Sequence, residues 1–271
     1  MTFVQRLHPF HRILHVFMAL SFLGLVASGM PLKYSHAPWA EWLVRLFGGY
    51  EGAGLVHRVC AVVTFGYFLS HIIYVVYDIA IVRHFKFDIF GPESIVPGIR
   101  DIEDIYHNLK WFLGEGPAPR FGRWTYWEKF DYWAVFWGVG MIGVSGLTLW
   151  FPEFFGQFLP GWIFNIATII HSDEALLASG FIFTIHFFNT HLRPEKFPMD
   201  TVIFTGKMSL EELRHERPLE YRRLKEGDAL EQYETPAPSV MFILVSGLFG
   251  FAAVVIGFFL LILIITGQFF S

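Results

Sequence analysis

Cysteine is almost absent from the chain: Cys60 is the single one among 271 residues. A lone cysteine excludes an internal disulfide and a cysteine-ligated iron–sulfur cluster. Covalently attached c-type haem is excluded as well, because the sequence contains no Cys-x-x-Cys-His motif. Charged residues are also scarce, at 16%, and the net charge of −4 argues against a nucleic-acid partner.

Long apolar runs are abundant instead. The chain is 54% hydrophobic and 19% aromatic, with 32 phenylalanines. Its apolar residues fall into runs of about 20, the length that a helix needs to span the hydrocarbon core of a membrane. The N-terminal sequence MTFVQRLHPFHR lacks the small-residue cleavage site of a secretory signal, so we expect insertion to begin with the first span. These features predict an all-α integral membrane protein.

The runs divide the chain into three parts, with no evident internal repeat or second soluble domain. Residues 1–194 contain four spans, predicted to form a bundle, and the polar loop 83–129 with a short helix near 101–112. Residues 195–238 are charged and expected to be helical, with a break at Pro218. Residues 239–271 hold a fifth transmembrane helix that contains no ionisable residue. The four spans of the bundle lie at about residues 13–31, 55–82, 132–151 and 163–191.

Lysine and arginine are unevenly divided between the two faces of the predicted bundle. The N-terminus, the loop 83–129 and the segment 192–238 together carry 17 of the 20 basic residues. By the positive-inside rule these segments face the cytoplasm. We therefore expect a cytoplasmic N-terminus and an extracytoplasmic C-terminus.

Five histidines lie within the apolar runs, where an ionisable residue is costly and indicates a functional site. The fourth span carries two of them 15 residues apart, which is about four helical turns plus ~60° and a rise of ~22 Å. The second span carries two that are 14 residues apart, and the first span carries one near its start. The five are His15, His57, His71, His171 and His186.

The predicted orientation places these histidines at two depths. His57 and His171 fall at the outer level, and His186 falls at the inner level with either His15 or His71. Two imidazoles from different helices can hold a six-coordinate haem b, which carries electrons and leaves no open position for O₂. A single such histidine is more often hydrogen-bonded to a neighbouring helix, and a zinc site needs ligands that converge at one depth. The matched pairs therefore predict two bis-histidine haems.

The sequence around these histidines resembles the cytochrome b subunits of formate dehydrogenase, of the gamma-subunit type, which are related to the bacterial b561 and hydrogenase cytochromes. The resemblance covers about residues 10–225. It is carried in order by RILHVFMALSFLGLVASGMPL, GLVHR, WEKFDYW, VSGLTLWFPEFFGQFLP, IIH ending at His171, and IHFFNTH. It implies a four-helix core in a bacterial inner membrane, in which His57 and His171 ligate the outer haem b and His15 and His186 the inner one.

Three features depart from that family. His71 stands where relatives often have arginine or an apolar residue, which keeps it open as the inner ligand in place of His15. The fourth-span spacing is one residue longer than in the formate dehydrogenase type, so we expect a π-bulge or a rotated His186. The fifth span has no counterpart in the four-helix members.

The resemblance also implies a quinone site, for menaquinone or ubiquinone, on the cytoplasmic side of the inner haem. Its expected boundaries are the start of the third span and the end of the fourth. Arg12 and Arg58 lie beside candidate ligands and could pair with haem propionates, or they could be interfacial arginines. Small residues at Ser28-Gly29, Ser145-Gly146 and Gly66 leave room for haem planes or simply for helix packing. In a regular α-helix, His191 points away from the face that carries His186, so we expect it to line the edge of the site. The expected quinone-site residues are Trp124, Tyr126, Glu128, Lys129, His186, Asn189 and His191.

These expectations describe an electron-transfer subunit of an oxidoreductase complex. Its partner outside the cytoplasm would be a multihaem cytochrome c or an iron–sulfur subunit of a dehydrogenase, hydrogenase or reductase. Electron flow in either direction between this partner and the quinone pool is compatible with the residues. The competing interpretation is a non-haem membrane anchor or transporter whose histidines line a proton path, and iron analysis separates the two.

Overall fold

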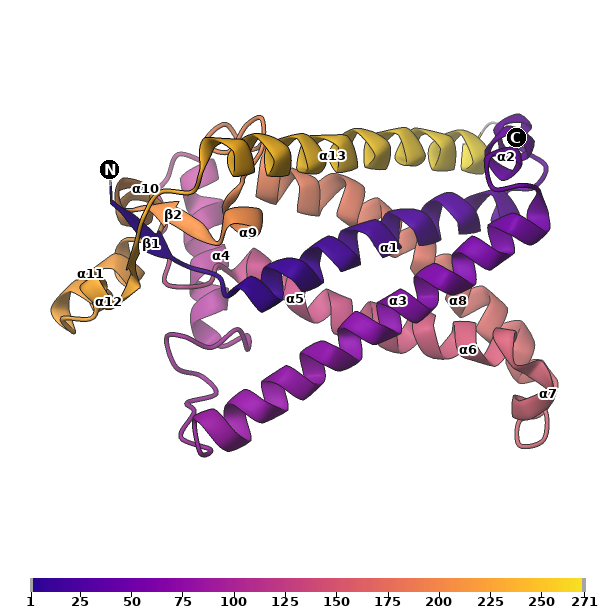
Figure 1. Ribbon diagram of the computed structural model, residues 1–271, viewed down its shortest axis with the longest axis horizontal. Coiled ribbons are helices and arrows are strands. Elements are labelled where there is room, and N and C mark those ends of the chain that lie inside the picture. Colours follow the sequence, from indigo (N-terminus) through magenta and orange to yellow (C-terminus); the bar gives the residue numbers. More distant parts are fainter. Residues whose placement is uncertain (1, 270–271) are drawn as a thin grey trace. The chain divides into compact units, whose positions relative to one another are not determined.

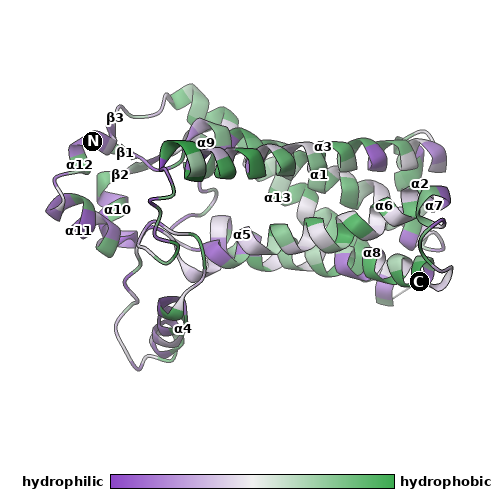
Figure 2. Cartoon of the chain, turned by 90° about the horizontal axis from the view of Figure 1, so that it is seen from below, coloured by the Kyte–Doolittle hydropathy of each residue, from purple (hydrophilic) through white to green (hydrophobic). Residues whose placement is uncertain are grey.

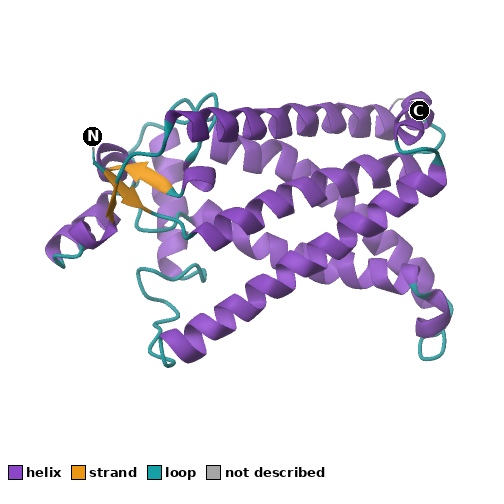
Figure 3. Ribbon diagram, viewed as in Figure 1, coloured by secondary structure: helices purple, strands orange, loops and turns teal. Residues whose placement is uncertain are grey.

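The computed structural model describes residues 2–269 of the chain. Within them, five helices are long and apolar enough to cross a membrane, which confirms the five predicted spans and indicates a multi-pass membrane protein (Figure 3). The first, second and fourth are longer than predicted at one end or at both, and the third begins earlier and ends one residue earlier. The spans are α1 (Pro9–Lys33), α3 (Tyr50–Tyr77) with η1 (Asp78–Val82), α5 (Tyr126–Gly138) with η2 (Val139–Gly143) and α6 (Val144–Trp150), α8 (Trp162–Phe181) with η3 (Ile182–His186) and η4 (Phe188–Leu192), and α13 (Val240–Phe269).

Four of these stretches, labelled η1 to η4, are π-helical. A π-helical turn closes hydrogen bonds between residues five apart and so takes up one extra residue in a helix. The stretch η3 lies between His171 and His186, where the longer spacing predicted a π-bulge, and this prediction is confirmed. The other π-helical stretches were not predicted.

The described chain separates into two compact units, and each is described here by itself. The first comprises the segment that ends at Arg12, together with Ile73–Ala134 and Thr201–Ser246. The second comprises Ile13–Ile72, Val135–Asp200 and the segment that begins at Gly247.

The first unit contains a small antiparallel sheet that the all-α prediction missed (Figure 1). Strand β1 (Phe3–Gln5) lies between β2 (Lys207–Ser209) and β3 (Glu234–Thr235), with Val4 opposite both Met208 and Glu234. Strands of two or three residues carry too little alternation to be recognised in a sequence. The buried residues Val4, Val202, Met208, Leu213 and Leu224 form the core of this unit.

Short helices complete the first unit. Helices α10 (Leu210–Glu216) and α11 (Pro218–Glu226) are separated at Arg217, because a proline fits the first turn of a helix but not its interior. This confirms the predicted break at Pro218. Helix α4 (Ile99–Phe112) matches the short helix expected in the loop between the second and third spans. The remaining ones are α9 (Val202–Thr205) and α12 (Leu230–Tyr233).

The second unit is built from helices that are largely hydrophobic (Figure 2). Two of these helices approach a neighbour closely at a glycine. A Cβ atom on Gly24 of α1 would lie 2.5 Å from the Sγ atom of Cys60 on α3. A Cβ atom on Gly257 of α13 would lie 2.5 Å from the ring of Phe187 at the end of the fourth span. Small residues allow this close approach of membrane helices. The fifth span is therefore packed directly against the other helices of this unit, which also contains α2 (Pro38–Leu46) and α7 (Pro152–Phe155).

Candidate functional site

The second unit brings the rings of His57 on α3 and His171 on α8 next to each other in an edge-on arrangement. Their ring centroids lie 6.0 Å apart, with an angle of 74° between the ring planes. Both side chains are partly buried among the spans. The predicted outer pair of histidines is thus adjacent in the structure, although the two residues are 114 positions apart in the sequence.

Hydrogen bonds fix the same tautomer in both rings. The Nδ1 atom of His171 lies 2.9 Å from the carbonyl oxygen of Ile142, which can only accept, so Nδ1 carries the proton. The Nδ1 atom of His57 lies 3.1 Å from the Oγ atom of Ser28, whose hydroxyl donates to the carbonyl of Gly24. Ser28 therefore accepts from His57. In both rings Nε2 keeps its lone pair, and neither Nε2 atom has a hydrogen-bond partner among residues 2–269.

The carbonyl that holds His171 comes from an unusual turn of helix. Ile142 lies in the π-helical stretch η2, where the backbone hydrogen bonds of an α-helix are interrupted. Its carbonyl oxygen accepts from His171 and from the hydroxyl of Ser145, which lies 3.1 Å away. Sequence analysis missed Ile142, because a backbone acceptor leaves no signature in the side chains.

Glycines make room for both imidazole rings. A Cβ atom on Gly146 would lie 2.8 Å from the Cε1 atom of His171, and one on Gly29 would lie 3.0 Å from the Cε1 atom of His57. The Ser-Gly pairs that were expected to accommodate haem planes thus admit the histidine rings themselves. A Cβ atom on Gly66 would meet nothing within 4 Å.

Each of the two histidine rings packs against a Ser-Gly pair on a neighbouring helix. Ser28-Gly29 on α1 receives His57 from the next span, and Ser145-Gly146 on α6 receives His171 from the next span. The motifs VASGMPL and GVSGLTL around these pairs are alike in sequence. This local similarity extends over only a few residues, which is too short to be evident as an internal repeat.

The spacing of the two rings fits a metal-centred group between them. Two in-line bonds of about 2 Å from imidazole nitrogens to a metal, together with the two ring radii, span about 6 Å. The observed centroid distance is 6.0 Å. Haem iron takes imidazole at its axial positions, so the donor set and the separation both suit a bis-histidine haem.

A second group of histidines lies in the same unit. His15 interacts electrostatically with both His186 and His191. The side chain of His191 is 6% exposed, and its Nδ1 atom has no hydrogen-bond partner among the described residues. The expectation that His191 points away from His186 assumed a regular α-helix. Because η3 and η4 are π-helical, residues five apart face more nearly the same side, and the two rings interact.

His71, the other candidate for the inner level, lies on α3 with its ring edge-on to Phe136. The two ring centroids are 6.1 Å apart. His15 interacts electrostatically with His186, and both His15 and His71 remain candidates for the inner partner.

The expected quinone-site residues on α5 belong to the first unit, where each has a protein partner. Glu128 accepts from Arg217 at 2.9 Å and from Arg6 at 3.4 Å through Oε1, and from the N–H and O–H groups of Thr125 through Oε2. Thr125 and Glu128 form the capping pattern of α5. The carboxylate of Glu128 is therefore committed to an ion network and to a helix cap.

Tyr126 and Lys129 have partners on α4. The hydroxyl of Tyr126 accepts from the side-chain amide of Asn108 at 2.7 Å. The Nζ atom of Lys129 lies 2.9 Å from Asp101. Trp124, before the helix, donates from Nε1 to the carbonyl of Glu93.

Three further expected residues occupy separate places. Arg12, in the first unit, donates from Nε to the carbonyl of Phe204 at 2.6 Å. Arg58, in the second unit, is exposed and adjoins Gly54. Asn189, also in the second unit, lies in η4 between His186 and His191.

The ion network around Glu128 contains more positive than negative buried charge. Arg6 and Arg217 are both more than nine-tenths buried and share the one carboxylate of Glu128. Burial and the neighbouring charge of Arg217 lower the pKa of Arg6 to about 10, although Glu128 opposes this shift. A parallel cluster pairs the buried Glu220 with Arg123 and Arg223, and the hydrogen bonds that Arg223 donates to Glu220 raise the pKa of Arg223.

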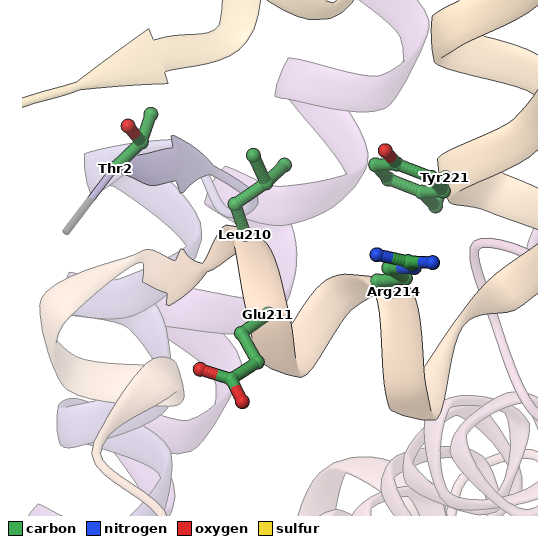
Figure 4. Close-up of a pocket in the computed structure, with 5 residues that line it drawn as sticks. All are labelled: Thr2, Leu210, Glu211, Arg214 and Tyr221. Atoms are coloured by element: carbon green, nitrogen blue, oxygen red, sulfur yellow. The ribbon is translucent and has the colours of Figure 1, made fainter.

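An open pocket of about 390 Å³ also lies in the first unit (Figure 4). It is lined by Thr2, Leu210, Glu211, Arg214 and Tyr221. None of the residues expected to bind a cofactor or quinone belongs to it.

Among residues 2–269, no three or more histidine, cysteine, aspartate or glutamate side chains form a group that could hold a metal ion. A bis-histidine haem needs only two protein ligands. Comparison with models of known protein families and with curated proteins finds no match to this chain. The resemblance to the formate dehydrogenase type thus remains a hypothesis drawn from the sequence.

Proposed function

We propose that this chain is a di-haem b-type membrane cytochrome subunit of a respiratory complex. It passes electrons across a bacterial inner membrane between an extracytoplasmic redox partner and the quinone pool. The observation that carries the proposal is the pair His57 and His171, held 6.0 Å apart with both Nε2 lone pairs available. The haems supply one-electron redox couples when bound.

At the outer site, hydrogen bonds to neighbouring helices orient both proposed ligands. Ser28 and the carbonyl of Ile142 accept the Nδ1 protons, which orients the rings and makes them stronger donors at Nε2. Gly29 and Gly146 allow the rings to lie against the neighbouring helices. These four groups therefore support His57 and His171 as the axial ligands.

At the inner site, we propose His186 and His15 as the ligands, with His71 as the alternative partner. The buried His191 lies in the same group, and Asn189 precedes it on the same turn. We assign these two residues to the edge where menaquinone or ubiquinone exchanges electrons with the inner haem. Both can hydrogen bond to a quinone carbonyl. Glu128 is left out of this site, because its carboxylate is committed to the ion network.

The partner supplies or receives the electrons at the outer site. A multihaem cytochrome c, or an iron–sulfur subunit of a dehydrogenase, hydrogenase or reductase, is the class of partner that fits. Because haem b without an open axial position only carries electrons, the chain has no substrate chemistry of its own apart from the quinone.

Absorption spectra and iron analysis of the purified chain test the proposal. We expect b-type bands in the reduced protein and two iron atoms per chain, as two haems require. His57→Ala and His171→Ala should each remove about half of the haem, and so should His186→Ala. His107→Ala, a change at an exposed histidine of α4, is the matched control and should leave the haem content unchanged.

Comparison of His15→Ala with His71→Ala identifies the inner partner, because only the true ligand lowers the haem content. Iron-free protein, or unchanged haem in both His57→Ala and His171→Ala, would falsify the proposal. Iron-free protein would instead favour a membrane anchor or a proton-path subunit.

A further inference from the structure

Helix α4 (Ile99–Phe112) presents an apolar face that no other described element covers. Apart from Trp111, which is 42% exposed on the opposite side of the helix, seven apolar residues at its surface are between 40% and 79% exposed. At 100° per residue they fall within one arc of about 140° on the helix. They are Ile99, Ile102, Ile105, Tyr106, Leu109, Phe112 and the following Leu113.

The polar side of the same helix packs against the protein. Asp101 and Asn108 are each 7% exposed. Asp101 pairs with Lys129 at 2.9 Å and accepts from the N–H group of Gly98, while Asn108 donates to Tyr126. These contacts attach α4 to the first turns of α5 (Figure 1) and fix its rotation about its own axis. The orientation is the reverse of a helix that packs on a soluble core, whose apolar side is buried.

The third side of α4 carries charge and faces solvent. Arg100, Glu103 and His107 are exposed and lie on an arc next to the apolar one. At the boundary between the two arcs, the Nζ atom of Lys110 lies 5.0 Å from the centre of the Tyr106 ring. A helix with adjacent apolar and charged arcs has the pattern of a helix that lies in a membrane interface.

Chain connectivity keeps α4 at the face of the membrane. The preceding span ends at Val82 and the next begins at Tyr126, and α4 is attached to the first turns of that next span. The intervening loop is fastened there as well, because Trp133 of α5 donates from Nε1 to the carbonyl of Ile95. Phe90 in this loop is 74% exposed and extends the apolar surface beside Gly98, just before α4.

We propose that α4 is a membrane-interface helix whose apolar arc is immersed in lipid at the boundary of headgroups and acyl chains. The occupant of this surface is therefore the bilayer itself. The charged arc with Glu103 then faces water. This surface has no part in the haem proposal and does not depend on it.

Fluorescent labels on α4 of the full chain test this assignment. In a Cys60→Ala background, single cysteines are placed at Leu109 in the apolar arc and at Glu103 in the charged arc. The labelled chains are reconstituted into phosphatidylcholine and phosphatidylglycerol vesicles whose acyl chains are brominated, and aqueous iodide is the second quencher. Both positions are exposed, so the two substitutions leave the packed side of α4 intact.

We expect the label at Leu109 to be quenched several-fold more by brominated lipid than by iodide, and the label at Glu103 to show the reverse. Ile102→Cys, at a second position in the apolar arc, should give the same quenching pattern as Leu109→Cys. This control excludes an effect that is confined to position 109. Equal quenching of both arcs by iodide would place α4 in water and overturn the proposal. Protection of the apolar arc from both quenchers would overturn it in favour of a protein partner or a second copy.

Discussion

In the unit that holds His57 and His171, both imidazole rings are held by a group of a neighbouring helix. In the unit that holds β1 and the start of α5, arginine and glutamate side chains are joined in a continuous ion network. Ser28 and the carbonyl of Ile142 satisfy one nitrogen of each imidazole and leave the other without a partner. The carboxylate of Glu128, by contrast, receives four donors.

This contrast separates side chains that have a group available for a ligand from side chains that are committed to the fold. A side chain with every lone pair engaged stabilises the fold and has no capacity left for a ligand. A side chain oriented by one hydrogen bond, with its second nitrogen available, has the arrangement of a metal ligand. Sequence analysis named both Glu128 and His171 as candidates, and the local hydrogen bonds distinguish them.

The largest expected effect comes from removing the centre of the ion network. Glu128→Ala leaves Arg6 and Arg217 buried without their carboxylate, and we expect the free energy of unfolding to fall by about 3–5 kcal/mol. The measurement is denaturant unfolding of the purified protein, with Glu231→Gln at an exposed position as the control. The double change Glu128→Ala/Arg217→Met should recover part of the loss, because one buried charge is also removed. A loss below about 1 kcal/mol would contradict the structural role of Glu128.

Filling the space beside the histidine should have the next largest effect. In Gly146→Ala, the added Cβ atom would lie 2.8 Å from His171, so the ring must move. We expect a loss of about 1–3 kcal/mol in unfolding free energy from overpacking, and selective loss of the outer haem. Gly140→Ala is the matched control, because a Cβ atom there meets nothing within 4 Å. Equal haem content in the two variants would show that the glycine does not shape the site.

Removal of the acceptor for His57 should weaken the site without blocking it. Ser28→Ala deletes the hydroxyl that orients the ring, and we expect the affinity for the outer haem to fall about tenfold. Haem titration of the apoprotein measures the change. Ser179→Ala is the control: this serine is equally buried, but its hydroxyl only donates within its own helix. Similar affinities in both variants would argue against an orienting role for Ser28.

The smallest effect concerns a carboxylate on the packed side of α4. Burial raises the pKa of Asp104, and the charge of Asp101 adds to the shift, although Arg100, Lys129 and His107 oppose it. The folded protein therefore holds this proton more tightly than the unfolded chain. Stability from this group is present below its ordinary value of 3.8 and is lost as the pH rises through the higher folded value.

Asp104→Asn removes this loss, since the amide stays uncharged. We expect the variant to exceed the parent in stability at neutral pH by less than about 0.5 kcal/mol, and to match it well below pH 3.8. Unfolding curves at the two pH values provide the test. A variant that is less stable than the parent at neutral pH would show that the charge of Asp104 is favourable.

The sequence by itself determined the five spans and the pairing of His57 with His171. Both follow from periodic and compositional rules: hydrocarbon thickness fixes the length of an apolar run, and regular helical rise converts sequence spacing into depth. The spacing of 15 residues between His171 and His186 is one longer than in the family that the sequence resembles. It predicted the π-helical stretch η3, because a π-helical turn accommodates one added residue in a helix.

Only the tertiary structure decided which polar groups remain available. The acceptor at Ile142 is a backbone carbonyl in the π-helical stretch η2, and the partners of Glu128 are Arg6 and Arg217, which are far away in the chain. Helix α4 is a second example. Its apolar pattern is present in the sequence, but the burial of its polar side depends on contacts with Lys129 and Tyr126. Such contacts join segments distant in sequence, and no local pattern specifies them. The physical reason is that each polar group can form only a limited number of hydrogen bonds. A group that is bonded within the fold is not available to a ligand, and only the folded chain determines which groups are bonded in this way.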